Sequence, residues 1–295
     1  MTIGIGVLAT GDEGRKTEII PDHAILISDT MGSFGDEYSH PRLHKRFDLP
    51  DEGLFIVAAD QIDKAAEVVP MIKAVVAAVP PQERSYGRLL ASVGNACFMY
   101  KADRFKMEIM PKHRIPPDSF SPFDGPKELN DLLGAEWQKF ELEFQLLIAA
   151  FDRLGQAHLI FVDGREGTAQ GRTLPGFCAI GSGAGNAMFW LAHRGHTLGM
   201  KPLRALYHAY EAKVMADDAP NVNEHVDILV ARADASWSFS SHFNEEEVKA
   251  LVSEIPTVSL GMMFEKFGPR STDELDTIKA ELIKLSAFRK SAGQQ

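Results

Sequence analysis

The order in which strand-like and helix-like stretches follow one another most constrains the fold of this chain. Strand-like runs are short and apolar or alternate, whereas helical runs repeat apolar residues every three or four positions. In chain order, the sequence predicts strands at 2–9, 24–28, 42–49 and 54–59, helices at 60–80 and 86–110, a short helix at 126–133, strands at 140–150, 158–162 and 177–180, helices at 187–196 and 202–215, and a strand at 226–230. Elements grouped in blocks predict an α+β fold in which two sheets carry helices on their outer faces.

Residues that cap or break helices refine these boundaries. Asp60 is the expected N-cap of the first helix, and Pro70 would kink that helix unless it lies near its start. The prolines around 112–125 predict an irregular excursion. Residues 236–295 form a polar-rich extension, in which a capping box at 271–274 predicts a last helix over Leu275–Phe288.

Charge and cysteine content limit the partners and the compartment. The net charge is −10, from 41 acidic and 31 basic residues, which argues against nucleic-acid binding through phosphate neutralisation. Cys97 and Cys178 lie in apolar surroundings and are expected to be buried free thiols in a reducing compartment. No apolar run reaches the roughly 18 residues of a membrane span, and no signal peptide is recognisable, so we expect a cytoplasmic protein.

The first two residues suggest a specific chemistry. Removal of Met1 would leave Thr2 with a free α-amine beside its own hydroxyl, so that one residue could act as nucleophile and base. Such a residue needs a cation close to its hydroxyl, a carboxylate that holds the cation, and backbone N–H groups for the developing oxyanion. The alternative is that Thr2 only begins a buried strand.

Three segments near the N-terminus resemble proteasome β-subunits, including the bacterial HslV-type peptidases. Residues 2–7, Thr-Ile-Gly-Ile-Gly-Val, are similar to the family's mature N-terminus, and residues 25–30 are similar to its second strand. In that resemblance Asp29 is the buried carboxylate. Lys45, sixteen residues further on, is the catalytic lysine, and it shares the apolar-facing side of its strand with Leu43 and Phe47.

Two later segments extend the resemblance. Residues 56–63 are similar to the segment whose backbone N–H forms the oxyanion hole, with Ala59 at the family's glycine position. Residues 179–184 resemble the family's Ile-Gly-Ser-Gly motif, in which Ser182 would lie near the threonine amine. The remaining aspartate of the family matches either Asp217 or Asp218.

The resemblance implies the four-layer αββα sandwich of N-terminal-nucleophile (Ntn) hydrolases over residues 1–235. Residues from about 103 to 140 would be an insertion, and 236–295 a C-terminal extension. It further implies a threonine peptidase that acts on peptides or unfolded proteins without a metal or organic cofactor. A homo-oligomeric ring and an ATP-dependent unfoldase partner belong to the same expectation.

Other interpretations remain open at this point. The chain could be an amidohydrolase of the same fold that acts on a small amide, or an inactive structural subunit of proteasome type. The glycine-rich run at 181–185 could cradle a phosphate at a helix N-terminus, although no Lys-Ser/Thr ending supports a P-loop. His193 with His196, or His40 with His44, could start a metal site, but no cysteine or carboxylate cluster joins them.

Overall fold

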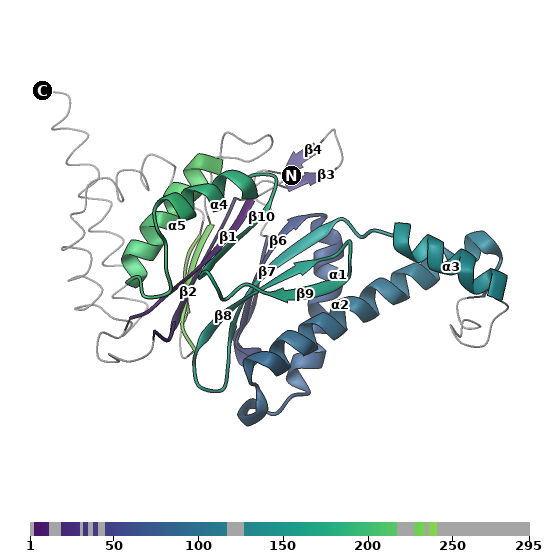
Figure 1. Ribbon diagram of the computed structural model, residues 1–295, viewed down its shortest axis with the longest axis horizontal. Coiled ribbons are helices and arrows are strands. Elements are labelled where there is room, and N and C mark those ends of the chain that lie inside the picture. The colour runs from purple at the N-terminus through teal and green to yellow at the C-terminus, as the bar shows by residue number, and fades with distance from the viewer. Residues whose placement is uncertain are drawn as a thin grey trace, which may run out of the picture.

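Two five-stranded antiparallel sheets and their flanking helices make up the described part of the chain (Figure 1). The computed structural model describes residues 3–11, 19–29, 32–34, 38–40, 45–116, 127–216, 227–233 and 236–240. The first sheet has the order β10-β1-β2-β11-β12, and the second has the order β5-β6-β7-β8-β9. The strands of the two sheets are β1 Ile3–Ala9, β2 His23–Ser28, β5 Arg46–Leu49, β6 Leu54–Asp60, β7 Phe144–Phe151, β8 Ala157–Asp163, β9 Thr168–Gly171, β10 Phe177–Gly181, β11 Asp227–Ala231 and β12 Ser236–Ser240.

The helices lie outside the sheets. They are α1 Ile62–Ala77, α2 Tyr86–Glu108, α3 Lys127–Lys139, α4 Ala184–His193 and α5 Pro202–Ala216, with short 3-10 turns at Pro50–Glu52, Pro81–Glu83 and Met110–His113. Helices α4 and α5 cover one face of the first sheet, and α1 and α2 cover one face of the second (Figure 1). Helix α3 packs beside the end of α2, where Trp137 meets Phe105 edge-on. A separate hairpin joins β3 Gly32–Phe34 and β4 Tyr38–His40.

Strand β1 lies in the middle of the molecule, and its residues alternate between a face toward the helices and a face toward the second sheet. Ile3, Ile5 and Val7 pack against α4 and α5, because residues two apart on a strand share a face. Gly4 and Gly6 face the second sheet instead. A Cβ on Gly4 would lie 2.9 Å from Val57 Cγ1, and one on Gly6 would lie 3.0 Å from Leu147 Cδ2. The two glycines therefore allow the sheets to approach closely along β1.

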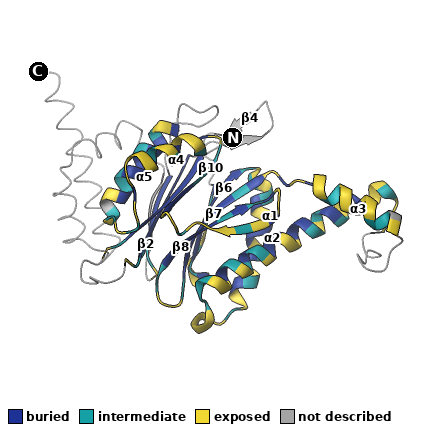
Figure 2. Ribbon diagram, in the orientation of Figure 1, coloured by how far each residue is buried: buried dark blue, intermediate teal, exposed yellow. Residues whose placement is uncertain are grey.

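The layer between the sheets is an apolar core of its own (Figure 2). It is built from the inward-facing residues of both sheets, among them Leu26, Val57, Leu147, Leu159 and Leu229. The opposite face of the second sheet, with Ile56, Ala58, Leu146 and Ile148, packs on α1 and α2. At about 25 cal/mol per Å² of apolar surface, such burial is the main favourable term for a chain of this length.

The expectation of an α+β fold with two sheets and outer helices is confirmed. The boundaries of most elements agree within a few residues, and β1 pairs with β2 as predicted. Cys97 and Cys178 are free and buried, and burial raises their thiol pKa values to about 12 and about 11.

Several local predictions were wrong. Asp60 is not the N-cap of α1: it is the last residue of β6 with φ 66°, and Gln61 caps the helix without a side-chain hydrogen bond. Pro70 lies inside α1 rather than near its start, so the kink expected there stays a prediction. Helix α3 runs to Lys139 rather than ending near 133, and β3, β4 and β9 were missed.

The predicted boundary at residue 235 falls inside the first sheet. Strand β12, Ser236–Ser240, pairs with β11, so the sheet continues into the proposed extension. The expected terminal helix at 275–288 lies outside the described residues, as do 42–44 of the third predicted strand. In the described part of the chain, no helix is both long and apolar enough to cross a membrane.

Candidate active site

A buried lysine–aspartate pair joins the two sheets at one edge. Asp29 directly follows β2, and Lys45 directly precedes β5. Lys45 Nζ donates to Asp29 Oδ1 over 2.8 Å, and both side chains are 0% exposed. Removing two charges from water costs several kcal/mol for each ion, and their attraction offsets this only in good geometry. Because such a pair adds little to stability, its burial points to a chemical role.

The same carboxylate oxygen also holds the N-terminal strand. The N–H of Ile3 donates to Asp29 Oδ1 over 3.0 Å, and the N–H of Asp29 donates to the carbonyl of Ile3 over 3.3 Å. Ile3 is covalently joined to Thr2. Thr2 itself lies outside the described residues, as do Asp217 and Asp218. The structure thus brings Asp29 and Lys45 together beside the residue that follows the predicted nucleophile.

Electrostatics at Lys45 are balanced between burial and acidic neighbours. Burial lowers the pKa of the Lys45 ammonium, whereas the charges of Asp29 and Asp60 raise it. Burial also raises the pKa of the Asp60 carboxyl. Asp60 is therefore a second carboxylate that acts on the lysine, which the sequence did not predict.

The ladder between β6 and β7 determines which backbone N–H can serve as an oxyanion donor. The N–H of Gln61 donates to the carbonyl of Glu143, so Gln61 and Glu143 form a hydrogen-bonded pair of the ladder. Hydrogen-bonded pairs recur every second residue, so Ala59 and Gln145 form another such pair. The N–H and C=O of Ala59 therefore point toward β7. A trans peptide places the next N–H opposite that C=O. The N–H of Asp60 therefore points away from β7, on the side where Ala58 N–H meets Lys45 O.

Ser182 lies in the turn between β10 and α4. The preceding residue, Gly181, has φ 87° and is paired with Ile3 in the β1–β10 ladder. The φ of Gly181 is in the left-handed region that favours glycine. Ser182 is exposed, and the ladder places it one residue from the partner of Ile3.

Two polar contacts at this edge were not predicted from the sequence. Arg46 Nη1 donates to Asp227 Oδ1 over 2.9 Å and so ties the start of β5 to β11 in the other sheet. The N–H of Gly181 donates to Gln145 Oε1 over 2.9 Å and ties β10 to β7. Gln145 carried a visible signal, because it is the polar residue in the apolar run Phe144–Phe151. The partners of Arg46 carried none.

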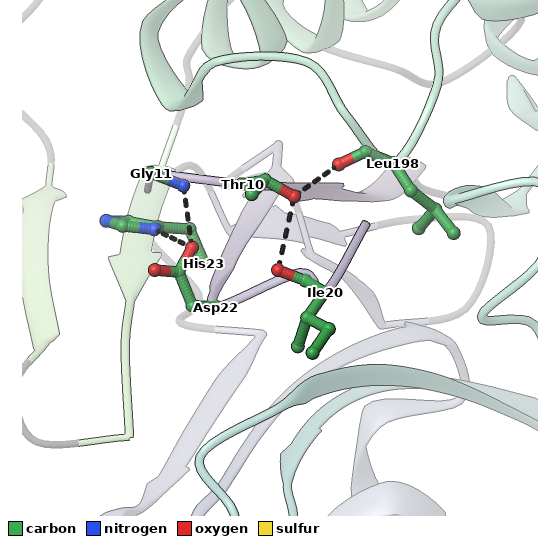
Figure 3. Close-up of polar contacts among 6 residues, drawn as sticks. All are labelled: Thr10, Gly11, Ile20, Asp22, His23 and Leu198. Atoms are coloured by element: carbon green, nitrogen blue, oxygen red, sulfur yellow. Dashed lines mark hydrogen bonds and ion pairs between the residues drawn. The ribbon is translucent and has the colours of Figure 1, made fainter. Parts of the chain in front are cut away.

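A second polar cluster closes the opposite end of β1 (Figure 3). Thr10 Oγ1 donates to the carbonyls of Leu198 over 2.8 Å and Ile20 over 3.3 Å. Asp22 Oδ1 accepts the N–H of Gly11 over 2.7 Å and contacts His23 Nδ1 over 2.8 Å. Most of these bonds satisfy backbone groups of the connection between β1 and β2, which is what a loop closure requires.

The proposed histidine metal sites gain no support from the geometry. Among the described residues, no three His, Cys, Asp or Glu side chains converge on one point. His196 is buried and donates its Nε2 proton to the carbonyl of Leu8 over 3.1 Å, whereas His193 stacks on Phe189. His40 ends β4, and His44 is outside the described residues.

Comparisons with known proteins add a likeness in structure but none in sequence. No family model matches the chain. No curated protein matches its sequence. Among solved structures, the chain is similar to the crystal structure of eukaryotic HslV from Trypanosoma brucei at 16% sequence identity, over 78% of this chain and 99% of that one, with a TM-score of 0.49. The chemistry therefore has to be argued from the residues of this chain.

Proposed function

We propose that the chain is an Ntn hydrolase of proteasome type, which cleaves peptide bonds through an acyl-enzyme on Thr2 after removal of Met1. The two sheets with α1, α2, α4 and α5 would then form the αββα sandwich of that class. The carrying observation is the shared oxygen Asp29 Oδ1, which accepts both Lys45 Nζ and the N–H of Ile3. This arrangement suits the activation of an N-terminal nucleophile, because it fixes an ammonium beside the first residue of the processed chain.

Each candidate residue has a role in the proposed reaction. The Thr2 hydroxyl attacks the peptide carbonyl, and its own α-amine, directly or through a water, takes the proton. The ammonium of Lys45, held by Asp29, lowers the pKa of the hydroxyl. The N–H of Asp60 takes the oxyanion role first assigned to Ala59, because the Ala59 N–H belongs to the β6–β7 ladder.

The remaining candidates support the amine, and water completes the cycle. Ser182 and one of Asp217 and Asp218 would hydrogen-bond near the α-amine of Thr2. The acyl-enzyme ester is then hydrolysed by water, which returns the free threonine. Substrates would be peptides or unfolded proteins, and the site needs no metal or organic cofactor. We place the enzyme in the cytoplasm.

Assembly is part of the same proposal. From the resemblance to proteasome-type peptidases, we propose a homo-oligomeric ring whose subunits meet through helices, with an ATP-dependent unfoldase as its partner. Residues of about 103–140 would be an insertion into the sandwich, and the chain beyond β12 would be a C-terminal addition to it.

One observation favours a second candidate, the hydrolysis of a small amide on the same fold. Asp60 places a partly buried carboxylate close enough to Lys45 to raise its pKa. A charged side chain at that position narrows the space next to the nucleophile and suits a small polar substrate.

Mass spectrometry and one substitution test the proposal. The purified chain should lack Met1 and should form a covalent adduct on Thr2 with a peptide vinyl sulfone. Thr2→Ala should abolish hydrolysis of fluorogenic peptide amides, while Thr10→Ala, a threonine at the other end of β1, should leave it unchanged. Retained Met1, or a Thr2→Ala variant as fast as the parent, would end the proposal. Sedimentation as a 32.5 kDa monomer would favour the small-amide hydrolase.

A further inference from the structure

Gln145 is a polar side chain in an apolar strand, at the end of β7 beside the candidate site. Every other residue of β7 is apolar. Since residues two apart share a face, Gln145 points the same way as Leu147 and Ala149, into the layer between the sheets. A polar group in that layer needs a hydrogen-bond partner, because desolvating it otherwise costs about 1–3 kcal/mol.

One hydrogen bond fixes the orientation of the Gln145 carboxamide. The N–H of Gly181 lies 2.9 Å from Oε1. A backbone N–H can only donate, so the oxygen must face Gly181 and the nitrogen Nε2 must point elsewhere. Gly181 is the ladder partner of Ile3, so the carboxamide reaches across the sheets to the backbone beside the proposed nucleophile.

The nitrogen of this amide is available to a ligand. Within the described ranges of the chain, the bond from Gly181 is the one hydrogen bond made by the Gln145 side chain, which leaves both Nε2 protons without a protein acceptor. Directly opposite on β6 is Ala59, whose methyl group occupies little of the inner face. The N–H of Asp60, the other proposed oxyanion donor, points away from β7 and therefore does not contact the Gln145 side chain.

We infer that Gln145 Nε2 donates a hydrogen bond to the carbonyl oxygen of the substrate as negative charge develops on it. This inference rests on the proposed function and adds a catalytic residue to it. In the step concerned, the Thr2 oxygen forms a bond to the carbonyl carbon, the C=O π electrons move onto the oxygen that Nε2 contacts, and the hydroxyl proton passes to the α-amine. Collapse of this intermediate breaks the C–N bond, and the leaving amine takes that proton.

The substitution Gln145→Glu separates donation from positioning. It keeps an oxygen that can accept from Gly181 N–H but removes the Nε2 donor at ordinary pH. Loss of one oxyanion donor typically lowers kcat about 10²–10³-fold. We expect a kcat about 100-fold below the parent on fluorogenic tripeptide amides, with KM within about threefold. Relative to the parent, activity should recover as the pH falls through about 4.3, the ordinary pKa of a glutamate, because the protonated carboxyl donates again.

Two matched variants control for the added charge and for the lost bond to Gly181. Gln170→Glu adds the same charge to an exposed residue of the same sheet, in β9, and should leave kcat unchanged. Gln145→Met removes donor and acceptor at similar volume. It should lose amide hydrolysis to the same extent, yet should react with a peptide vinyl sulfone within about threefold of the parent, because that reaction builds its charge on carbon. Thermal unfolding of each variant confirms that it is folded.

The outcomes distinguish this inference from the proposed function. A Gln145→Glu variant within threefold of the parent overturns the donor role, even where Gln145→Met is impaired, since only the bond to Gly181 would then matter. If Gln145→Glu does not fold, equal losses of Gln145→Met toward the amide and the vinyl sulfone overturn it. A parent that neither hydrolyses amides nor forms an adduct on Thr2 overturns the proposed function and this inference with it.

Discussion

The two ends of β1 both carry a hydrogen-bonded aspartate, but they use it differently. At the Thr10 end, the Asp22 side chain is 36% exposed, and it contacts the neighbouring His23 and the backbone of Gly11. At the Ile3 end, Asp29 is fully buried and holds a lysine sixteen residues away. The first cluster closes a loop with local, partly solvated bonds, whereas the second removes a full ion pair from water.

This difference distinguishes polar side chains that only stabilise a loop from a polar pair that we propose takes part in a reaction. A loop can be closed at low cost by an exposed carboxylate and backbone donors. A buried Lys–Asp pair could be replaced by apolar side chains with little loss of stability, so stability alone does not explain why this chain has one. The expected effects of substitution differ accordingly: the Ile3 end should control activity, and the Thr10 end only stability.

The largest effect is expected at Lys45. Lys45→Met should lower kcat/KM by about 10³-fold or more, because the ammonium proposed to activate Thr2 is lost. It should also destabilise the fold by about 3–5 kcal/mol, since the buried Asp29 carboxylate loses its cation. Urea unfolding and peptide hydrolysis measure the two effects.

A double variant separates them. Asp29→Asn combined with Lys45→Met removes both charges, so it should recover part of the lost stability but none of the activity. Peptide hydrolysis by the double variant at the parent rate would assign the pair to the fold alone.

Acid should lower the stability of the fold through His196, which bonds to the Leu8 carbonyl near the Thr10 end of β1. Burial lowers the pKa of His196 to about 4, below the unfolded value of about 6.5. The folded protein therefore favours the neutral imidazole. As the pH falls from about 6.5 toward 4, the unfolded chain binds a proton at His196 that the folded protein does not, so the free energy of unfolding decreases over this range. The loss is at most about 3 kcal/mol. His196→Gln should flatten the fall in urea midpoint between pH 7 and 4.5, and an unchanged fall would locate the titration elsewhere.

A smaller effect is expected at Asp22. Asp22→Ala removes the acceptor of Gly11 N–H and the partner of His23, which should cost about 1–2 kcal/mol. Asp22→Asn keeps an acceptor and should lose less. Both variants should hydrolyse peptides at the parent rate per folded molecule at pH 7. A loss of kcat at constant stability would show that the two ends of β1 are coupled.

The smallest effect concerns the backbone of Asp60. Its φ of 66° favours glycine, so Asp60→Gly should change stability by less than about 1 kcal/mol, whereas Asp60→Ala should lose about 1 kcal/mol. Both variants keep the N–H proposed for the oxyanion. Thermal unfolding compares them, and an Ala variant as stable as the Gly variant would contradict the assigned conformation.

The sequence predicted those features that depend on short segments of the chain. Periodicity located β1, β2, β6, α2 and α5, and the resemblance to proteasome β-subunits, which includes the sixteen-residue spacing, implied Asp29 and Lys45 as candidates. The short strands β3, β4 and β9 lack a long enough pattern to detect. The proposed oxyanion donor is Asp60 rather than Ala59, because the direction of a backbone N–H depends on ladder register, which no motif contains.

Long-range contacts were beyond prediction. The Arg46–Asp227 pair spans 181 residues, and the bond between Gly181 and Gln145 spans 36. Both depend on how closely the two sheets approach, which the packing around Gly4 and Gly6 determines. The roles of Thr2, Ser182 and Asp217 stay predictions.

The position of β1 between β2 and β10 has a consequence during synthesis. Ile3 leaves the ribosome well before its ladder partner Gly181. Until then, the strand that leads to Thr2 lacks one of its two neighbours. In the proposed enzyme, a nascent chain therefore cannot complete the site before the strand that contains Gly181 has been made and has paired with β1.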